Sequence, residues 1–505
     1  MDKEISTGTK PCLVQTSQGF TVSYKEKLLY SKYNPSKAIL QFIENLQIQP
    51  QTVILCVSPV LSYGLKELSD KLPEDCLMLG CEYDAELYDF ITQNNKEFCD
   101  IKNFTFLSRE ELSQIGPILA QKNKGNFRRI IRVDFSAGAQ LNSTIYDSLM
   151  ENATNAIMTY WANRVTLVKF GRRYSTNFFK NLAWSRKTTP TQNFFGSIEK
   201  PIYVFGAGES LSQGIQKLGK DSYIICADTA LQPLVAQGII PDAVFIEEAQ
   251  NVISKCFIGM QKVNTHIFAG LSSLHALTRY FKPEQISFFT TMYTQAEFIE
   301  RFKREGILPP ANEPFGSVGI TAYYYALLFR KNDKVPLYTY GLDFSYSAGR
   351  THTKGAMADN ARFLNSSRIK PDTNYAAAFN EPAFKKNETM FTTPIMARYE
   401  AIMKALREPL GQQATDKSVI SESIEGPQKT TQILQDEAAS LEKLKSLLTG
   451  ETKLPAEQLE KEITQLIQER EYLYLHFPDG HKFQYTQSFL NRVRIEIDYY
   501  LKILG

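Results

Sequence analysis

The chain has 505 residues, of which 43% are hydrophobic and 22% charged, and this composition excludes a disordered, collagen-like or coiled-coil protein. Its 57 lysines and arginines against 54 aspartates and glutamates leave a net charge of +3. Proteins that bind nucleic acid by neutralising phosphates usually carry a clear basic excess, so we expect no nucleic-acid partner. At roughly 150 residues per domain, the length predicts about three domains.

No segment of the sequence predicts export or membrane insertion. The amino terminus, Met1-Asp2-Lys3-Glu4, is polar, and the apolar run 322–329 is far shorter than the ~20 residues that cross a bilayer. The odd number of cysteines and the absence of C-x-x-C spacing favour reduced, mostly buried thiols and no metal site. The seven cysteines stand at positions 12, 56, 76, 81, 99, 226 and 256. We therefore expect a cytoplasmic protein without a membrane span.

Residues 1–165 are predicted to form an N-terminal Rossmann-like α/β domain. Strands are expected at 20–24, 27–30, 52–57, 76–81 and 130–133, and helices at 35–46 and 61–72. Glu82 stands where a dinucleotide-binding unit places its ribose-binding acid, but the turn 58–64 lacks the glycines that allow close phosphate approach. This favours a degenerate unit that has lost its cofactor loop over a working one.

Residues 166–410 are predicted to form a second Rossmann-like domain, after a mainly helical stretch at 140–185. Strands alternating with helices predict a parallel sheet covered on both faces. The expected strands are 202–205, 223–227, 243–246, 265–269, 286–289 and 335–340, and the expected helices are 211–218, 229–237 and 319–330. A polar linker at 411–430 then leads into three amphipathic helices, so residues 411–505 are predicted to be a C-terminal α-helical domain.

The strongest local signal for a binding site is Gly206-x-Gly208-x-Ser210-Leu211, directly after a predicted strand. Gly206 permits a tight turn, and Gly208 removes a side chain where a phosphate would approach backbone amides. Ser210 is expected to cap the helix and to donate to a phosphate oxygen. A glycine-rich turn without a ligand is the alternative.

Polar residues also follow the other predicted strands, at the edge where open parallel sheets bind ligands. Asp228, Glu247 with Glu248, and Asp343 each come after a strand, and His352 lies in a polar loop just beyond the last one. Such an imidazole can act as a general base, although a structural role is the alternative. Ser317 precedes the predicted helix 319–330, where it is either a simple cap or part of a second anion cradle.

Taken in order, these segments resemble the motility accessory factor glycosyltransferases of flagellated bacteria. The matching pieces are Phe205-Gly-Ala-Gly-Glu-Ser-Leu211, Ala227-Asp-Thr-Ala-Leu231, Gly238-Ile-Ile-Pro-Asp242, Gly316-Ser-Val318, and Gly341-Leu-Asp343 with Thr351-His352. The central domain also looks like bacterial sialyltransferases and, more distantly, like an archaeal pterin diphosphokinase domain. The sequence departs from the family pattern at Glu247, Phe315 and Tyr340, where the family usually has Asp, Gly and Gln.

The resemblance implies an inverting transferase that moves a nonulosonic sugar from a CMP-activated donor to Ser or Thr of flagellin, with no separate cofactor or metal. His352 would act as the base. The donor would be bound by the following residues: Gly206, Gly208, Glu209, Ser210, Asp228, Thr229, Glu247, Ser317 and Asp343. A pterin-type diphosphokinase and a non-catalytic flagellar accessory protein are the alternatives, and a homo-oligomer stays open.

Overall fold

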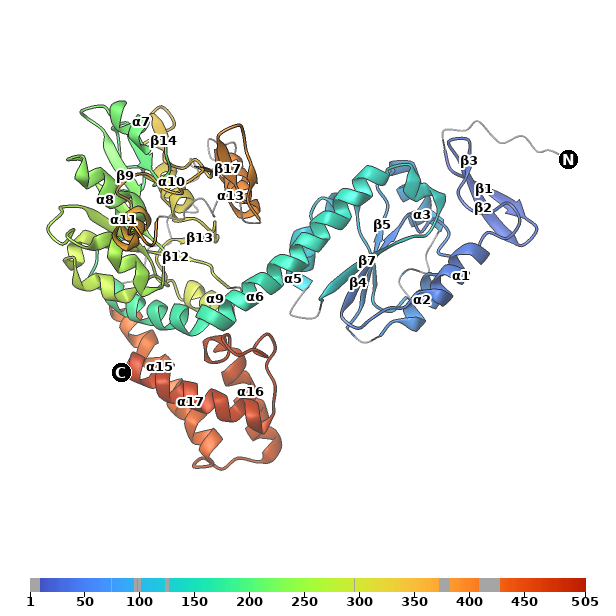
Figure 1. The fold of residues 1–505 in the computed structure, drawn as a ribbon. Helices are drawn as coiled ribbons and strands as arrows, with labels where there is room; N and C mark the ends of the chain where they lie inside the picture. The colour runs from blue at the N-terminus through green and yellow to red at the C-terminus, as the bar shows by residue number, and fades with distance from the viewer. Residues whose placement is uncertain are drawn as a thin grey trace. The chain divides into compact units, whose positions relative to one another are not determined.

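The computed structural model describes residues 10–73, 75–94, 98, 101–122, 127–294, 296–371, 382–407 and 427–505. These fall into two compact units, Met1–Lys169 with Phe477–Lys482, and Phe170–His476 with Phe483–Gly505. The boundary lies inside one long helix, α6 (Ser143–Ser185), which Figure 1 shows in green-blue. The C-terminal helices, predicted as a third domain, thus cluster with the central sheet. Residues 411–426 of the predicted linker and Cys99 lie outside the described residues.

The first unit is built on a four-stranded parallel sheet in the order β6-β5-β4-β7. Figure 1 labels β4, β5 and β7 of this sheet. The strands are β4 (Thr52–Val57), β5 (Leu77–Cys81), β6 (Phe104–Phe106) and β7 (Arg129–Asp134). The helices are α1 (Lys37–Asn45), α2 (Leu65–Lys71), α3 (Ala85–Asn94), α4 (Arg109–Leu112) and α5 (Ile115–Lys122). A small antiparallel sheet precedes them, formed by β1 (Cys12–Thr16), β2 (Gly19–Tyr24) and β3 (Lys27–Leu28). The sequence did not predict β1, β6 or the helices between β5 and β7.

Glu82, after β5, is fully buried with 0% of its surface exposed. Both of its carboxylate oxygens accept hydrogen bonds from protein groups. Its Oε1 accepts from the Tyr146 hydroxyl at 2.8 Å and the Asp84 amide at 2.9 Å, and its Oε2 accepts from Ser58 Oγ at 2.6 Å. Burial raises the pKa of this carboxyl. The position that would hold a ribose is therefore filled by the domain itself, which favours the predicted loss of the cofactor site.

The second unit contains a seven-stranded sheet in which all neighbours run parallel. In spatial order the strands are β13 (Ala311–Asn312), β12 (Ile286–Thr291), β11 (His266–Gly270), β10 (Ala243–Ile246), β9 (Tyr223–Ala227), β8 (Ile202–Phe205) and β14 (Leu337–Tyr340). The chain leaves β8 toward β9 and returns on the other side of β8 as β14. The topological switch point, where such sheets bind ligands, is thus between β8 and β14.

Helices cover both faces of this sheet, and the predicted strands are found with shifts of one or two residues. The helices are α7 (Leu211–Gln216), α8 (Asp228–Ala236), α9 (Glu297–Arg304) and α10 (Val318–Phe329). Helix α10 packs its buried aromatic and aliphatic side chains against the core strands, Phe245 and Phe268 among them. An insertion follows β14, with β15 (Tyr346–Ser347), α11 (Met357–Asn365), β16 (Phe384–Lys385), β17 (Met390–Thr392) and α13 (Pro394–Arg407).

The C-terminal helices join this unit through buried charges. They are α15 (Pro427–Thr449), α16 (Ala456–Gln468) and α17 (Gln487–Leu504). Glu437 of α15 accepts from Arg301 of α9 at 2.8 Å and from the Tyr472 hydroxyl at 2.7 Å. Glu471 accepts from the Glu297 and Phe298 amides at the start of α9, at 2.8 and 3.3 Å. These contacts explain why the helices and the sheet form one unit.

Across the described ranges, no helix is long and apolar enough to cross a membrane, and no three His, Cys, Asp or Glu side chains are placed to hold a metal ion. The cysteines described are free thiols, and all but Cys12 are buried.

Candidate functional site

Two glycine-containing loops interlock at the switch point of the central sheet. The first follows β8 and the second follows β14, so their first residues lie on neighbouring strands. The Gly206 amide donates to the Tyr340 carbonyl, and the Gly208 amide donates to the Gly341 carbonyl, both at 2.8 Å. These two amides are therefore used by the protein, and phosphate binding by the other amides of the turn stays a prediction.

The glycines are required because the two loops approach each other backbone to backbone. A Cβ on Gly206 would lie 2.3 Å from the Gly341 carbonyl oxygen, and a Cβ on Gly341 would lie 2.0 Å from the Gly206 oxygen. A Cβ on Gly208 would lie 2.3 Å from Oδ2 of Asp343. Gly341 also has a φ of +70°, which favours glycine. Close contact between the two loops therefore accounts for the glycines of this pattern.

Ser210 and Asp343 join the loop after β8 to the loop after β14 by hydrogen bonds. These contacts differ from the roles that the sequence predicted for the two residues. The Ser210 amide donates to Asp343 Oδ2 at 3.0 Å, and the Ser210 hydroxyl donates to Oδ1 of the same carboxylate. That hydroxyl also accepts from the Gly341 amide at 2.7 Å. Ser210 makes no side-chain cap on α7, so the predicted cap is wrong. With both oxygens of its carboxylate engaged by Ser210, Asp343 positions the turn.

Leu342 fills a space that two glycines leave open. Its Cδ2 would lie 2.5 Å from a Cβ on Gly206 and 2.3 Å from a Cβ on Gly319, in the first turn of α10. Glu209 points to the insertion, where it accepts from the Ser347 amide at 3.0 Å and from the Ser347 hydroxyl. The sequence contained one signal for the contact with Leu342, the second glycine in Gly316-Ser-Val-Gly319. The structure shows that this glycine leaves room for the Leu342 side chain.

The loop that carries His352 lies against the glycine turn. The Thr353 amide donates to the Ala207 carbonyl at 2.7 Å, which brings the imidazole loop to the switch point. Among the described residues, the amides of Ala207 and Glu209 donate to no protein acceptor. The turn that the His352 loop contacts therefore has two backbone amides, those of Ala207 and Glu209, for which the described residues supply no acceptor.

His352 is half-buried, and its surroundings favour the neutral imidazole, which can accept a proton. Its Nδ1 lies 3.1 Å from Oγ1 of Thr351. Burial lowers its pKa below the ordinary 6.5, the Arg362 charge lowers it further, and Asp359 opposes both. The imidazole is therefore mostly neutral at pH 7.

The remaining predicted residues form a second group at the carboxyl ends of β9 and β10. Asp228 is the first residue of α8, and its Oδ1 accepts from the Thr229 amide at 2.6 Å. Glu247 accepts from Oγ1 of Thr291 at 2.5 Å and from Oγ1 of Thr321 at 2.7 Å. Burial raises the pKa of Glu247.

Ser317 stands at the start of α10 with an extended backbone and makes no side-chain cap, so the simple-cap alternative is wrong. Its carbonyl accepts from the Thr321 amide at 3.2 Å, which places Ser317 one turn before the threonine that binds Glu247. The sequence did not predict the parts that Thr291 and Thr321 play. The spacing of Ser317 and Thr321, one helical turn apart, was the available signal.

Asp228 gives a test of this second group. Burial, reinforced by the charges of Glu247 and Glu248, raises the pKa of Asp228 from 3.8 to about 7. Since the folded state holds this proton more tightly than the unfolded state, stability falls as pH rises from about 4 to about 7 and is level above that window. The variant Asp228→Asn replaces this carboxyl with an amide that does not titrate, so it serves as the reference. In urea unfolding, we expect the free energy of unfolding of the wild type to fall relative to this variant between pH 5 and 7, by up to about 1.4 kcal/mol per pH unit. Equal pH dependence of both proteins would contradict a neutral Asp228.

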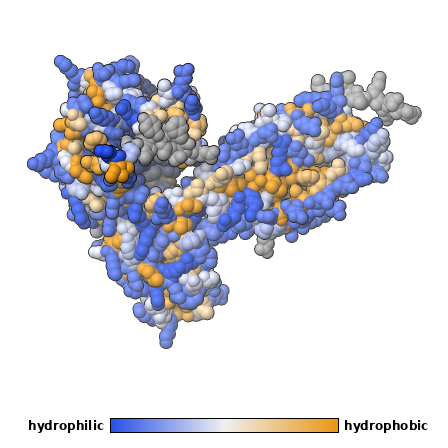
Figure 2. Space-filling view, in the orientation of Figure 1, coloured by the Kyte–Doolittle hydropathy of each residue, from blue (hydrophilic) through white to orange (hydrophobic). Residues whose placement is uncertain are grey.

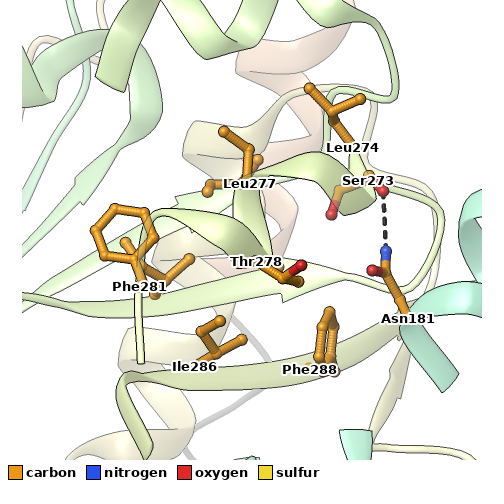
Figure 3. A pocket seen from close by; sticks show the side chains of 11 residues that line it. Asn181, Ser273, Leu274, Leu277, Thr278, Phe281, Ile286 and Phe288 are labelled. Atoms are coloured by element: carbon orange, nitrogen blue, oxygen red, sulfur yellow. Dashed lines mark hydrogen bonds between the residues drawn. The ribbon is translucent and has the colours of Figure 1, made fainter. Parts of the chain in front are cut away.

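One enclosed cavity of the second unit lies between β11, β12 and the segment 273–281 (Figure 3). Asn181 of α6 points into this region and donates to the Ser273 carbonyl at 2.9 Å (Figure 3). The volume is about 10 Å³, room for one water at most, and none of the predicted site residues lines it. It is a packing defect beside the sheet and not a substrate pocket.

Three comparisons with known proteins bear on this site. A family model described as 6-hydroxymethylpterin diphosphokinase MptE-like matches residues 176–349. A protein of Treponema pallidum (strain Nichols), described as uncharacterized, is 29% identical over 98% of this chain and 95% of its own. The solved structure of the MAf glycosyltransferase from Magnetospirillum magneticum AMB-1 is similar with a TM-score of 0.55 and 12% identity, over 98% of this chain and 91% of that one.

The matched family segment runs from the end of α6 to the insertion after β14, so it contains both interlocked loops and the second group. The structural match extends over both units and the C-terminal helices. The chain thus has the α/β fold of a motility accessory factor glycosyltransferase, as the resemblance in its sequence predicted, with an MptE-like domain at its centre.

Proposed function

We propose that this protein is a glycosyltransferase that moves a nonulosonic sugar from a CMP-linked donor to Ser or Thr of flagellin in the cytoplasm. The observation that carries the proposal is the hydrogen bond from the Thr353 amide to the Ala207 carbonyl, at 2.7 Å. It holds the loop that carries His352 against the glycine turn at the switch point of a parallel sheet, where ligands of such folds bind. The fold shared with a MAf glycosyltransferase supports the same reaction class.

The donor's single phosphate would lie against the Ala207 and Glu209 amides. Backbone N–H groups stabilise an anion without requiring a metal ion or a lysine. The sugar carboxylate would face the second group, where burial raises the pKa of Asp228 to about 7 and so keeps part of this carboxyl protonated at pH 7. A protonated carboxyl can donate a hydrogen bond to an anion, whereas an ionised one would repel it.

The transfer step would use His352 as the base. The acceptor hydroxyl oxygen attacks the anomeric carbon while the imidazole takes the hydroxyl proton. The bond from the anomeric carbon to the phosphate oxygen breaks, and CMP leaves with the electron pair. Attack opposite the leaving group inverts the anomeric centre. A neutral base with a pKa near or below 6.5 suits this step at pH 7.

A diphosphokinase is the second candidate, because the MptE-like family model covers the two interlocked loops and the second group, although it ends before His352. It would bind ATP with magnesium in place of a CMP sugar. A non-catalytic accessory protein is the third, because the Gly206 and Gly208 amides are occupied by protein.

Thermal shift separates the three candidates. A ligand at about 100 times its Kd adds about 2.7 kcal/mol to stability, and we expect CMP to raise the melting temperature of the second unit by roughly 5–10 °C. UMP and ATP with magnesium serve as matched controls and should give little shift. A shift with ATP and magnesium alone would identify a diphosphokinase, and no shift with any nucleotide would favour the accessory protein.

A further inference from the structure

The parallel sheet of the first unit ends at a strand with one open edge. β7 pairs with β4, and no other described strand lies on its far side. Sheets of this type commonly continue with a further strand after the next helix. Here the helix that follows β7 is α6, which runs on to Ser185 in the second unit without such a strand. The sheet therefore stops one strand short.

The open edge carries a regular row of backbone groups. The Arg129 and Phe135 amides donate to carbonyls of β4 and the residue before it, at 3.3 and 2.9 Å, so every second residue of β7 faces β4. By alternation the amides of Ile130, Arg132 and Asp134 point away from β4. Within the described residues these three amides have no protein acceptor. Only another extended backbone matches donors and acceptors at this spacing.

The edge lies in a groove of about 780 Å³. Its lining includes Leu28, Tyr30, Ala38, Phe42, Arg132 and Asp134. Phe42 of α1 is 50% exposed, a large apolar side chain at the rim. Figure 2 shows an apolar band on the first unit in the region where Figure 1 places β7.

The two walls of the groove differ in chemistry. On one side α1 presents apolar side chains, since Ile39 packs with Val133 and Phe135 of the β7 segment. On the other side Arg132 pairs with Asp134 and with Asp147 of α6, both at 2.6 Å. A strand added here would place alternate side chains against an apolar and a charged wall.

We propose that this edge binds an extended segment of the polypeptide acceptor, with alternating apolar and polar residues, as an added strand beside β7. The proposal rests on the proposed function for the existence of such an acceptor. The groove between α1 and the Arg132–Asp134 pair fits a single extended segment, and a second copy of this chain is the competing occupant that the test distinguishes.

The outward amide of Asp134 makes the test specific. Asp134→Pro removes this donor without removing a bond to β4, and an edge strand tolerates proline where its N–H faces outward. Asp134→Ala is the matched control, because it loses the same carboxylate and keeps the amide. We measure binding of each full-length variant to unmodified flagellin monomer by biolayer interferometry, and record the CMP thermal shift in parallel.

We expect Asp134→Pro to bind flagellin about tenfold or more weakly than Asp134→Ala, with the CMP shift unchanged in both. Phe42→Glu, a surface change that leaves the strand intact, should weaken binding as well. In the wild type, flagellin should slow hydrogen exchange at the Ile130 and Arg132 amides.

Equal affinity of Asp134→Pro and Asp134→Ala would overturn the proposal, and so would a wild type that does not bind flagellin. Either result leaves the CMP shift as an independent test of the transferase. If sedimentation shows that Asp134→Pro abolishes a dimer while flagellin still binds, the edge belongs to a second copy and the proposal fails.

Discussion

Gly341→Ala is expected to lower the melting temperature of the second unit by about 5–15 °C, the largest stability loss that the structure implies for a single methyl group. The new Cβ would lie 2.0 Å from the Gly206 carbonyl oxygen, a backbone atom that cannot move without shifting β8. Left-handed backbone adds about 1–2 kcal/mol for a non-glycine residue, and overpacking adds about 1–3. Their sum is about 2–5 kcal/mol, which at roughly 2–4 °C per kcal/mol corresponds to about 4–20 °C, and the expected loss lies in the middle of that range.

Gly238→Ala is the matched control. Gly238 has a φ of +75°, close to that of Gly341, but nothing lies within 4 Å of its added Cβ. This variant carries the backbone strain alone, and we expect a loss of only a few degrees in differential scanning calorimetry. If both variants lost the same stability, the interlock of the two loops would contribute nothing beyond the φ angle.

The sequence predicted the central sheet well because its strands are continuous apolar runs of four to six residues separated by helical patterns. Burial on both faces leaves that signature on β8 to β12 and on β4. The strands it missed are short or exposed. β13 has two residues, β6 has three, and β1 is largely exposed, so none of them forms a buried run.

The sequence predicted where the residues of the candidate site lie, but only part of what they contact. The strand-end rule placed Gly206, Asp228, Glu247 and Asp343 at one edge of the sheet, because parallel strands end together. It could not show that two loops far apart in the chain would meet backbone to backbone. In a single sequence, a glycine required by a ligand cannot be told from one required by another loop, and the Cβ distances at the turn show that the loop contact alone requires these glycines.

A similar ambiguity explains Asp343. A carboxylate after a strand fits a ligand-binding role and a positioning role equally well in sequence. Its partner, Ser210, is 133 residues away in the chain, and no local pattern connects the two. Removing Asp343 would therefore disturb the turn before it affected any ligand, which makes it a poor position for testing chemistry.

His352→Ala is the change with the largest expected effect on activity. General base catalysis is worth about 10²–10⁴ in rate, so we expect transfer from the CMP donor to fall by at least a hundredfold. The CMP thermal shift should stay within error, because the backbone bond from Thr353 to Ala207 does not involve the imidazole. Transfer is measured by intact mass of flagellin in single-turnover reactions.

Lys354→Ala is the control on the same loop, since Lys354 is exposed and should leave the rate within about twofold. The pH profile adds a readout that loss of structure would not mimic. In the wild type the rate should fall as pH drops through the lowered pKa of His352, below 6.5, because the protonated ring cannot accept a proton. In His352→Ala this acid limb should vanish, and added imidazole should restore part of the rate by entering the vacated space. A variant that keeps the wild-type rate, or keeps the acid limb, would show that another group takes the proton and that the Thr353–Ala207 contact serves packing alone.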